Sequence, residues 1–236
     1  MALILSIETG TDICSVALAN DGELMALRES DEGRDHAKKV AVFVDELLRE
    51  TGVQPSDLDA IAVGKGPGSY TGLRIGVSFA KGMCYALNIP LIAVGSLDAL
   101  ARVAREDFDA GILDVEDEEW ADARLCPMVD ARRMEVYAQI FTTAGEPLSD
   151  VVAEVVTEDS FRDVRSSGRL VIFGNGAAKC TEALRDAIHV GVSPSARGIV
   201  ALAEERFRAS QFEDLAYFEP FYLKEFLVIP SKKKLL

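Results

Sequence analysis

The chain has 236 residues, of which 49% are hydrophobic, and a formal net charge of −14 at pH 7. A hydrophobic content of this size is enough for a substantial core, so the composition excludes an intrinsically disordered chain. Acidic residues outnumber basic residues by 39 to 25. Because a protein that grips a phosphate backbone normally presents a basic surface, we do not expect this chain to hold a nucleic acid unaided.

The opening apolar run, residues 3–7, is cut short at Glu8, so we expect neither a signal peptide nor a membrane-spanning helix. The four cysteines are far apart and have neither Cys-x-x-Cys spacing nor paired histidines nearby: Cys14, Cys84, Cys126 and Cys180. This pattern argues against a structural zinc site and predicts reduced core thiols in a cytoplasmic protein.

The first part of the chain predicts three strands and a helix. We expect strands over residues 3–7, 13–19 and 23–29, with a turn at 8–12 after the first strand. A helix is expected over residues 35–50, because its larger apolar side chains recur at helical spacing.

The start of this helix carries residues of interest. Ala37 and Ala41 form a strip of small side chains beside its larger apolar face. His36 has no second metal ligand at helical spacing, because Lys39 and Val40 stand there, so no metal site is predicted. We interpret His36 either as an interface or capping residue or as a solvent-exposed histidine.

A strand at 60–63 leads into a segment from Gly64 to Gly76 that holds five glycines in thirteen positions, and a helix is expected over 71–87. A glycine-rich turn between a strand and a helix usually meets an anion or another backbone. Lys65 stands near the beginning of the segment, which excludes the Walker form, and no acidic residue follows at the spacing of the dinucleotide form. The alternative is a tight connection that needs glycine only for its path.

The helix over 71–87 carries four small residues at every fourth position: Gly72, Gly76, Ala80 and Cys84. These side chains would lie in one stripe, where a second helix can approach closely. The remaining positions are also largely apolar, which predicts burial on more than one side. The covering helix can belong either to this chain or to another protein.

The second half repeats the order of the first. It begins with an acidic segment at 106–122, which contains Trp120 and which we interpret as a surface loop or a short helical insertion. Strands are then expected at 125–129, 134–141 and 148–156. A helix at 158–165, a strand at 170–173 and a helix at 177–188 should follow. A last helix is expected over 196–211, and it can cross back onto the first lobe.

A duplicated three-stranded meander followed by crossover helices predicts an α/β protein with the two-lobed actin/Hsp70/sugar-kinase fold, with lobes at 1–105 and 106–236. In enzymes of this fold the first turn of each lobe lies beside the nucleotide phosphates. Here those turns contain Glu8, Thr9 and Thr11 in the first lobe and Asp130 in the second. Because Glu8 is longer than aspartate and the second turn has no glycine, we predict a vestigial nucleotide site.

Five segments resemble those of one family and follow the same order along the chain. The stretch Gly66-Pro67-Gly68-Ser69-Tyr70-Thr71-Gly72-Leu73-Arg74-Ile75-Gly76 resembles the signature of the TsaB (YeaZ-like) proteins. Residues 3–9 resemble that family's opening strand, and His36 with the amphipathic helix after it resembles its first helix. Residues 130–137 and 222–224 resemble its second hairpin and closing element. The sequence departs from the family pattern at Glu8, where aspartate is common, and at Gly10, where serine is common.

This resemblance implies a noncatalytic subunit that dimerises with the catalytic TsaD protein, in transfer of a threonylcarbamoyl group to the adenosine beside the anticodon of tRNAs. It implies that a TsaE ATPase joins the pair. ATP and metal are then expected on the partner subunits and are not bound tightly by this chain alone. The chain is expected to contact tRNA only as part of the complex. The chain alone is expected to form a homodimer. The residues expected to bind the partner are His36, Ala37, Ala41, Gly72, Gly76, Ala80 and Cys84.

The competing hypothesis is an ATP-dependent small-molecule kinase of the same fold, with Asp130 as base and the turn from Glu8 to Thr11 holding phosphate. Such a kinase needs a glycine-rich adenine loop in the second lobe, where this chain has only Gly174-Asn175-Gly176. Near the end of the chain, Lys232-Lys233-Lys234 is either a small electrostatic contact or a solvated tail.

Overall fold

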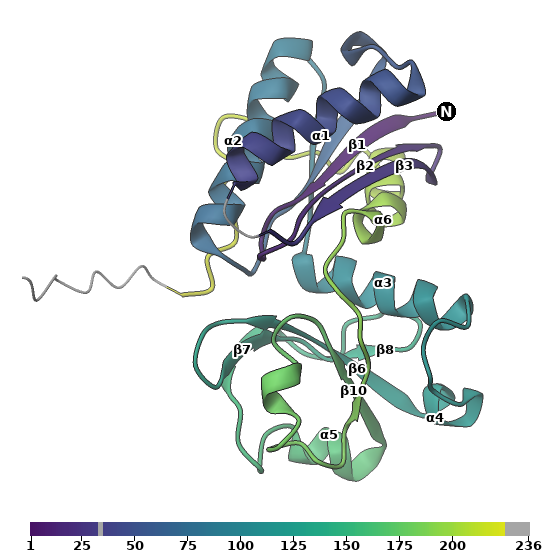
Figure 1. The fold of residues 1–236 in the computed structure, drawn as a ribbon, viewed down its shortest axis with the longest axis vertical. Coiled ribbons are helices and arrows are strands. Elements are labelled where there is room, and N and C mark those ends of the chain that lie inside the picture. Colours follow the sequence, from purple (N-terminus) through teal and green to yellow (C-terminus); the bar gives the residue numbers. More distant parts are fainter. Residues whose placement is uncertain (33–34, 225–236) are drawn as a thin grey trace, which may run out of the picture.

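A computed structural model describes residues 1–32 and 35–224, and the predicted basic segment Lys232–Lys234 lies outside that part. The described chain forms two lobes, one above the other in Figure 1, each with a mixed β-sheet. Helix α3 lies between them (Figure 1).

The first lobe contains a five-stranded sheet in the order β3-β2-β1-β4-β5. Its elements are β1 (Leu3–Glu8), β2 (Cys14–Asn20), β3 (Glu23–Ser30), α1 (His36–Thr51), the 3-10 turn η1 (Pro55–Asp57), β4 (Ala60–Gly64), α2 (Tyr70–Leu87) and β5 (Leu91–Val94). The first three strands are antiparallel, whereas β4 and β5 run parallel to β1. The predicted strands and helices of this half are confirmed, and their ends differ by at most one residue.

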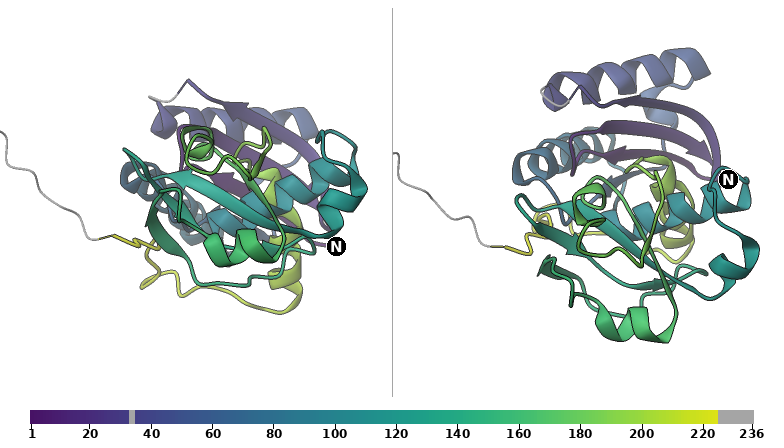
Figure 2. Two further views of the ribbon diagram at one scale, coloured as in Figure 1. Left: turned by 90° about the horizontal axis from the view of Figure 1, so that it is seen from below. Right: turned by 60° about the horizontal axis from the view of Figure 1, so that its bottom comes forward.

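Helices cover both faces of the first sheet. The side chains of Leu5 and Ile7 are fully buried and pack with α1 and α2, whereas Ile4 belongs to a separate cluster with α3 and α6 (Arg197–Arg208). This division follows from the alternation of side chains along β1. Figures 1 and 2 show α1 and α6 on opposite sides of the sheet.

The second lobe repeats this topology. Its elements are α3 (Ser96–Asp109), α4 (Asp117–Ala121), β6 (Ala123–Asp130), β7 (Glu135–Ala138), β8 (Phe141–Thr142), β9 (Val152–Val155), α5 (Arg162–Ser167), β10 (Arg169–Phe173), η2 (Ala178–Cys180) and β11 (Ile188–His189). The sheet order is β11-β10-β6-β7-β9. Strand β7 is antiparallel to both β6 and β9, whereas β10 is parallel to both β6 and β11. Strand β8 also pairs with β6. The predicted duplicated, two-lobed α/β fold is confirmed.

The helices of the second lobe are shorter than expected. The predicted helix at 177–188 is wrong: only η2 forms there, and Ile188 pairs with β10 as part of β11. The helix predicted at 158–165 begins later, at Arg162. A hydrogen-bonded turn comes first, in which the amide of Thr157 donates to Ser160 Oγ at 3.0 Å.

The predicted boundary at residues 105 and 106 falls inside α3, which packs on β6 of the second lobe and on α6. Helix α6 in turn lies on the first sheet. The chain after α6 also contacts the first lobe: the amide of Glu213 donates to the carbonyl of Leu91 at 2.9 Å and that of Phe221 to the carbonyl of Lys65 at 2.7 Å. Residues 197–222 therefore pack with the first lobe, as considered for the late helix at 196–211, although the division by sequence number places them in the second.

The acidic segment 106–122 contains the end of α3 and the short helix α4. Trp120 is buried, and its ring stacks on Phe108 with centroids 4.2 Å apart and planes 4° from parallel. Asp114, Glu116, Asp117 and Glu118 are exposed, whereas Asp107 is buried and Trp120 joins the core of the second lobe.

The four cysteines all lie in the described part of the chain and are free and buried, as predicted for core thiols. Burial raises the pKa of Cys14 and of Cys84 to about 11, so both thiols are protonated at neutral pH.

Candidate functional site

The glycine-rich loop between β4 and α2 lies directly on the turn that follows β1. The amide of Ser69 donates to the carbonyl oxygen of Gly10 at 2.6 Å. A Cβ atom added at Gly68 would lie 2.2 Å from that same oxygen, and one added at Gly72 would lie 2.0 Å from the carbonyl oxygen of Thr9. Of the two expected roles of the loop, contact with an anion or with another backbone, the structure has the second, and the backbone is the chain's own.

Glu8 lies at the end of β1 and is fully enclosed. Its Oε1 accepts a hydrogen bond from the amide of Gly10 at 2.7 Å, and its Oε2 accepts one from Ser96 Oγ at 2.8 Å. Burial raises the pKa of the carboxyl, and these hydrogen bonds oppose that rise only in part. Glu8 therefore ties the first turn to the start of α3.

The two threonines of the first turn are also engaged within the chain. Thr9 Oγ1 donates to the carbonyl of Gly72 at 2.8 Å, and Thr11 Oγ1 accepts from the amide of Ile13 at 3.2 Å. Both threonines are buried. The hydroxyl groups that could hold a phosphate in a nucleotide enzyme thus already have partners inside the protein.

His36 is buried, and its Nε2 donates to the carbonyl oxygen of Thr11 at 2.9 Å. The ring joins the start of α1 to the first turn. Because the ring is buried and bonded within the chain, the interpretation of His36 as a solvent-exposed histidine is wrong, whereas its role in binding a partner stays a prediction.

Asp130 lies in the second turn and is exposed. Its carboxylate contacts Lys179 Nζ and accepts from the amide of Arg132 at 3.0 Å. Its own amide donates to Asn175 Oδ1 at 3.1 Å, and Asn175 Nδ2 donates to Asp12 Oδ1 at 3.0 Å. Asn175 therefore links the first turns of the two lobes, and Lys179 neutralises the carboxylate that a kinase would use as a base.

The stripe of small residues on α2 faces the interior. All four of its members are buried: Gly72, Gly76, Ala80 and Cys84. Ala80 and Cys84 pack against the first sheet, and a Cβ atom at Gly76 would lie 2.2 Å from Thr9 Oγ1. The prediction that this stripe binds a partner is therefore corrected: it allows α2 to approach the sheet and the first turn of the same chain.

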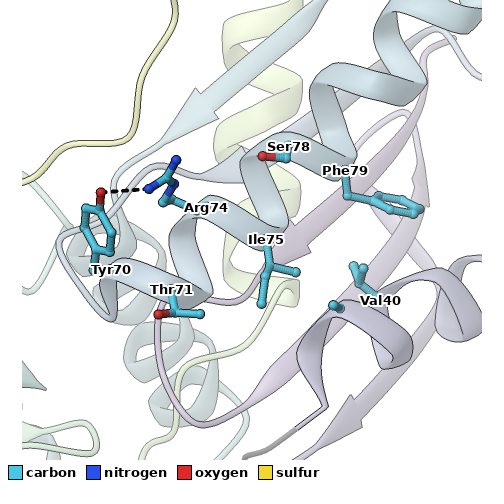
Figure 3. A pocket seen from close by; sticks show the side chains of 8 residues that line it. Val40, Tyr70, Thr71, Arg74, Ile75, Ser78 and Phe79 are labelled. Carbon is cyan, nitrogen blue, oxygen red and sulfur yellow. Dashed lines mark hydrogen bonds between the residues drawn. The ribbon is translucent and has the colours of Figure 1, made fainter. Parts of the chain in front are cut away.

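The opposite side of α2 forms a groove with α1, which has a volume of about 650 Å³ (Figure 3). Its lining residues are Ala37, Val40, Tyr70, Thr71, Arg74, Ile75, Ser78 and Phe79. Ala37 and Ala41, predicted as partner-binding, are exposed on α1; Ala37 lines the groove and Ala41 lies one turn further along.

Sequence reasoning missed the residues of α2 that line this groove. Their spacing carried the signal: positions 70, 74 and 78 and positions 71, 75 and 79 form two rows at every fourth residue, on the side of the helix away from the glycines. Of the two alternatives for the small stripe, the structure has it covered by the same chain, and the row at positions 70, 74 and 78 is exposed.

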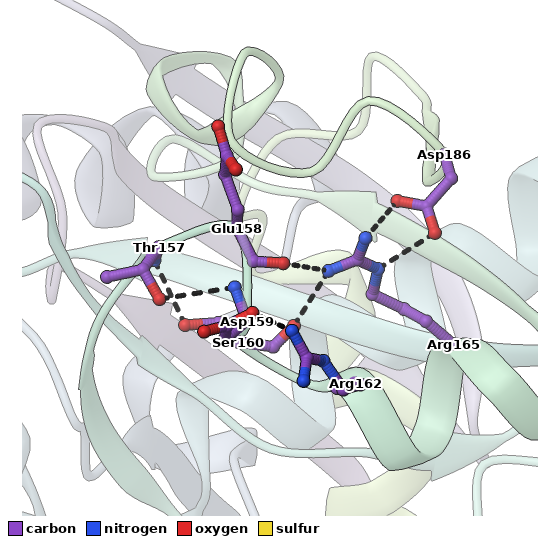
Figure 4. A network of polar contacts seen from close by, with 7 residues as sticks. All are labelled: Thr157, Glu158, Asp159, Ser160, Arg162, Arg165 and Asp186. Carbon is purple, nitrogen blue, oxygen red and sulfur yellow. Dashed lines mark hydrogen bonds and ion pairs between the residues drawn. The ribbon is translucent and has the colours of Figure 1, made fainter.

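Another groove, which is polar and has a volume of about 350 Å³, lies in the second lobe. Figure 4 shows the hydrogen bonds around it. Arg165 donates to Asp186 Oδ2 at 3.0 Å, to the carbonyl of Glu158 at 2.9 Å and to that of Ser160 at 3.1 Å. Arg162 contacts Asp159. Because these guanidinium groups are engaged locally, the network joins α5 to its neighbouring loops and leaves no evident ligand site.

Within residues 1–32 and 35–224 no group of three or more His, Cys, Asp or Glu side chains is arranged to hold a metal ion. In the same part of the chain, no helix combines the length and the hydropathy that a membrane span requires.

A family model described as TsaD: tRNA N6-adenosine threonylcarbamoyltransferase matches residues 30–169. The chain is also similar to proteins named tRNA threonylcarbamoyladenosine biosynthesis protein TsaB. Identity is 33% over 172 residues with that of Bacillus subtilis, covering 72% of this chain and 69% of that protein. It is 29% over 234 residues with that of Escherichia coli, covering 94% of each. It is 33% over 156 residues with that of Haemophilus influenzae, covering 66% of this chain and 56% of that protein.

Among solved structures, YeaZ from Pseudomonas aeruginosa superposes with a TM-score of 0.73 at 26% identity, covering 94% of this chain and all of that one. The agreement in sequence and in the two-lobed fold extends over both lobes. The chain therefore belongs to the family of tRNA threonylcarbamoyladenosine biosynthesis proteins TsaB.

Proposed function

We propose that this chain is a noncatalytic subunit that docks a TsaD-like threonylcarbamoyltransferase on the groove between α1 and α2. In this role it supports transfer of a threonylcarbamoyl group to the adenosine beside the anticodon of tRNAs. The observation that carries the proposal is the outward-facing apolar groove in a member of the TsaB family. An exposed apolar groove of this kind is typical of a docking site for a helix.

The noncatalytic role is supported by the first turn. The glycine-rich loop lies on that turn, Thr9 and Thr11 are buried, and the carboxylate of Glu8 is held by Gly10 and Ser96. A phosphate would have to displace these contacts. We therefore assign the binding of ATP and metal to the partner subunits. These partners are a catalytic TsaD-like protein and a TsaE-like ATPase.

The charge of the chain supports an indirect role toward tRNA. With a net charge of −14 the protein repels a phosphate backbone, so tRNA is bound through the complex and not by this chain alone. In the absence of a partner, the apolar groove favours self-association, which makes a homodimer the expected state of the isolated chain.

The kinase hypothesis gains no support from these contacts. It requires an open first turn and a free carboxylate at Asp130, whereas Lys179 contacts that carboxylate and the amide of Asp130 is bonded to Asn175.

The test is binding of the full chain to the TsaD-like protein of the same source, measured by isothermal titration and by size-exclusion chromatography with light scattering. Ala37→Arg places a long cationic side chain in the groove from an exposed helical position, so we expect it to abolish the complex. Ala86→Arg makes the same change at an exposed position of α2 that does not line the groove, and should bind as wild type does.

Equal binding by both folded variants would move the docking site away from the groove. Absence of a complex with the wild-type chain, at concentrations where modification of tRNA is reconstituted, would overturn the proposed function itself.

A further inference from the structure

The groove between α1 and α2 has one permanently charged side chain among its lining residues, Arg74. Figure 3 shows that it lies with Tyr70 toward one end of the groove, whereas Phe79 and Val40 lie toward the other. From Arg74 to Phe79 the helix advances by five residues, or about 7.5 Å. The groove therefore changes from cationic to apolar within about one and a half helical turns.

Aromatic side chains hold the guanidinium group in place. Arg74 Nη1 donates to the hydroxyl of Tyr70 at 2.8 Å, and the guanidinium carbon lies 5.2 Å from the centre of the Tyr70 ring. The ring of Tyr222 lies against Tyr70, with centroids 4.9 Å apart. Because these contacts restrict the side chain before any partner arrives, less rotational freedom is lost on docking.

Across residues 1–32 and 35–224, Arg74 forms no ion pair with a carboxylate, although the chain contains 39 acidic residues. Other arginines of the structure do have such partners: Arg165 contacts Asp186, and Arg197 contacts Asp107 at 2.7 Å. Within the described residues, Arg74 is therefore bonded to the neutral hydroxyl of Tyr70, and no carboxylate there neutralises its charge.

The first turn of α2, which precedes Arg74, contains no acidic residue that could offset this charge. A helix that covers the groove would remove water from the guanidinium group. An arginine covered in this way without a carboxylate would weaken the complex.

We propose that the docked helix of the catalytic partner carries a carboxylate that pairs with Arg74. This inference rests on the proposed function and specifies the chemistry of its partner. The helix has an apolar face that fills the groove beside Ile75 and Phe79, and an aspartate or glutamate about one and a half turns away. The pair fixes the direction of the helix, because reversing the helix would place its carboxylate against Phe79 and leave Arg74 unpaired.

The experiment measures the affinity of the full chain for the TsaD-like protein at low and high salt. We expect Arg74→Ala to weaken binding by about 30-fold, Arg74→Lys to weaken it less, and Arg74→Glu to weaken it most because it adds repulsion. These differences should shrink at high salt. Arg185→Glu makes the same charge change at an exposed position in the second lobe, and should bind as wild type does.

The acidic residues of the partner's docking helix are then changed to lysine one at a time. One of these changes should restore binding to Arg74→Glu. If wild type binds and Arg74→Glu binds as Arg185→Glu does, the pairing of Arg74 is overturned while the proposed function stands. If wild type does not bind, the proposed function fails and the inference fails with it. If Arg74→Glu weakens only self-association, the carboxylate belongs to a second copy of this chain and the assignment to the partner is wrong.

Discussion

The side chain of Thr9 fills the space beside Gly76 on α2. A Cβ atom at Gly76 would lie 2.2 Å from Thr9 Oγ1, and the same hydroxyl donates to the carbonyl oxygen of Gly72 at 2.8 Å. This contact fixes the orientation of α2: the face with glycines lies against the first turn, and the face with Arg74 and Ile75 lines the groove. Thr9 therefore acts together with the packing of Ala80 and Cys84 on the sheet to set which side of α2 a partner can reach.

From this contact we expect Gly76→Ala to destabilise the fold. The added methyl group overlaps Thr9 Oγ1, and relieving the overlap requires a shift of α2 or a new rotamer, at a cost of about 1–3 kcal/mol. Urea unfolding followed by circular dichroism measures the loss. Thr9→Ala combined with Gly76→Ala should cost less than the two separate effects added together, because it removes the overlapping oxygen.

Gly82 provides the matched control in the same helix. No atom lies within 4 Å of a Cβ at this exposed position, so Gly82→Ala should stabilise the chain by about 0.5–1 kcal/mol. Similar effects of the two substitutions would show that the contact with Thr9 has no energetic weight.

The burial of Glu8 leads to a prediction on pH. Its pKa in the folded chain is raised above the ordinary value of 4.5, so the folded state holds this proton to higher pH than the unfolded state does. The free energy of unfolding contributed by Glu8 is therefore largest below about pH 4.5 and is lost as the pH rises through the folded-state pKa. Glu8→Gln keeps an acceptor for the amide of Gly10 and cannot ionise.

We expect Glu8→Gln to be at least as stable as wild type at pH 7, with the difference between the two chains falling as the pH is lowered toward 4.5. Comparing the variants at each pH cancels the other titrating groups, including Asp98, whose pKa is also raised by burial. A Glu8→Gln chain that is less stable than wild type at pH 7 and equal to it at pH 4.5 would contradict the assignment.

The order of the strands along the chain could be predicted from the sequence because alternating apolar runs and turns recur in both halves. Whether the stripe of small residues on α2 faces the interior or a partner could not be predicted. Spacing places Gly72, Gly76, Ala80 and Cys84 on one side of a helix, but an approaching helix and an approaching turn need the same small residues. Only the distance to Thr9, which lies 67 positions before Gly76, distinguishes them. The groove was missed because spacing on α2 alone does not show that the row of Tyr70, Arg74 and Ser78 faces α1.

Nucleotide binding by the isolated chain is expected to be weak. The first turn is covered by the glycine-rich loop, and its threonine hydroxyls already have partners, so MgATP has to break internal hydrogen bonds to enter. Isothermal titration with the chain alone should give a Kd no tighter than about 1 mM, that is, a binding free energy of about −4 kcal/mol or weaker.

Asp130→Asn should leave reconstituted tRNA modification unchanged. Micromolar binding by the isolated chain, lost in Asp130→Asn, would support a nucleotide site instead.

Trp120, the single tryptophan of the chain, reports on how the two lobes unfold. It is buried against Phe108 at the end of α3, and α3 packs both on β6 of the second lobe and on α6, which covers the first sheet. Because these helices join the lobes, we expect the urea transition seen by Trp120 fluorescence to coincide with that seen by circular dichroism. Trp120→Ala should cost about 3–5 kcal/mol through the cavity it leaves, whereas Trp120→Phe should cost less because it retains an aromatic ring beside Phe108. A fluorescence transition at clearly lower urea than the loss of helix would mean that the second lobe unfolds alone, and that α3 and α6 do not couple the lobes.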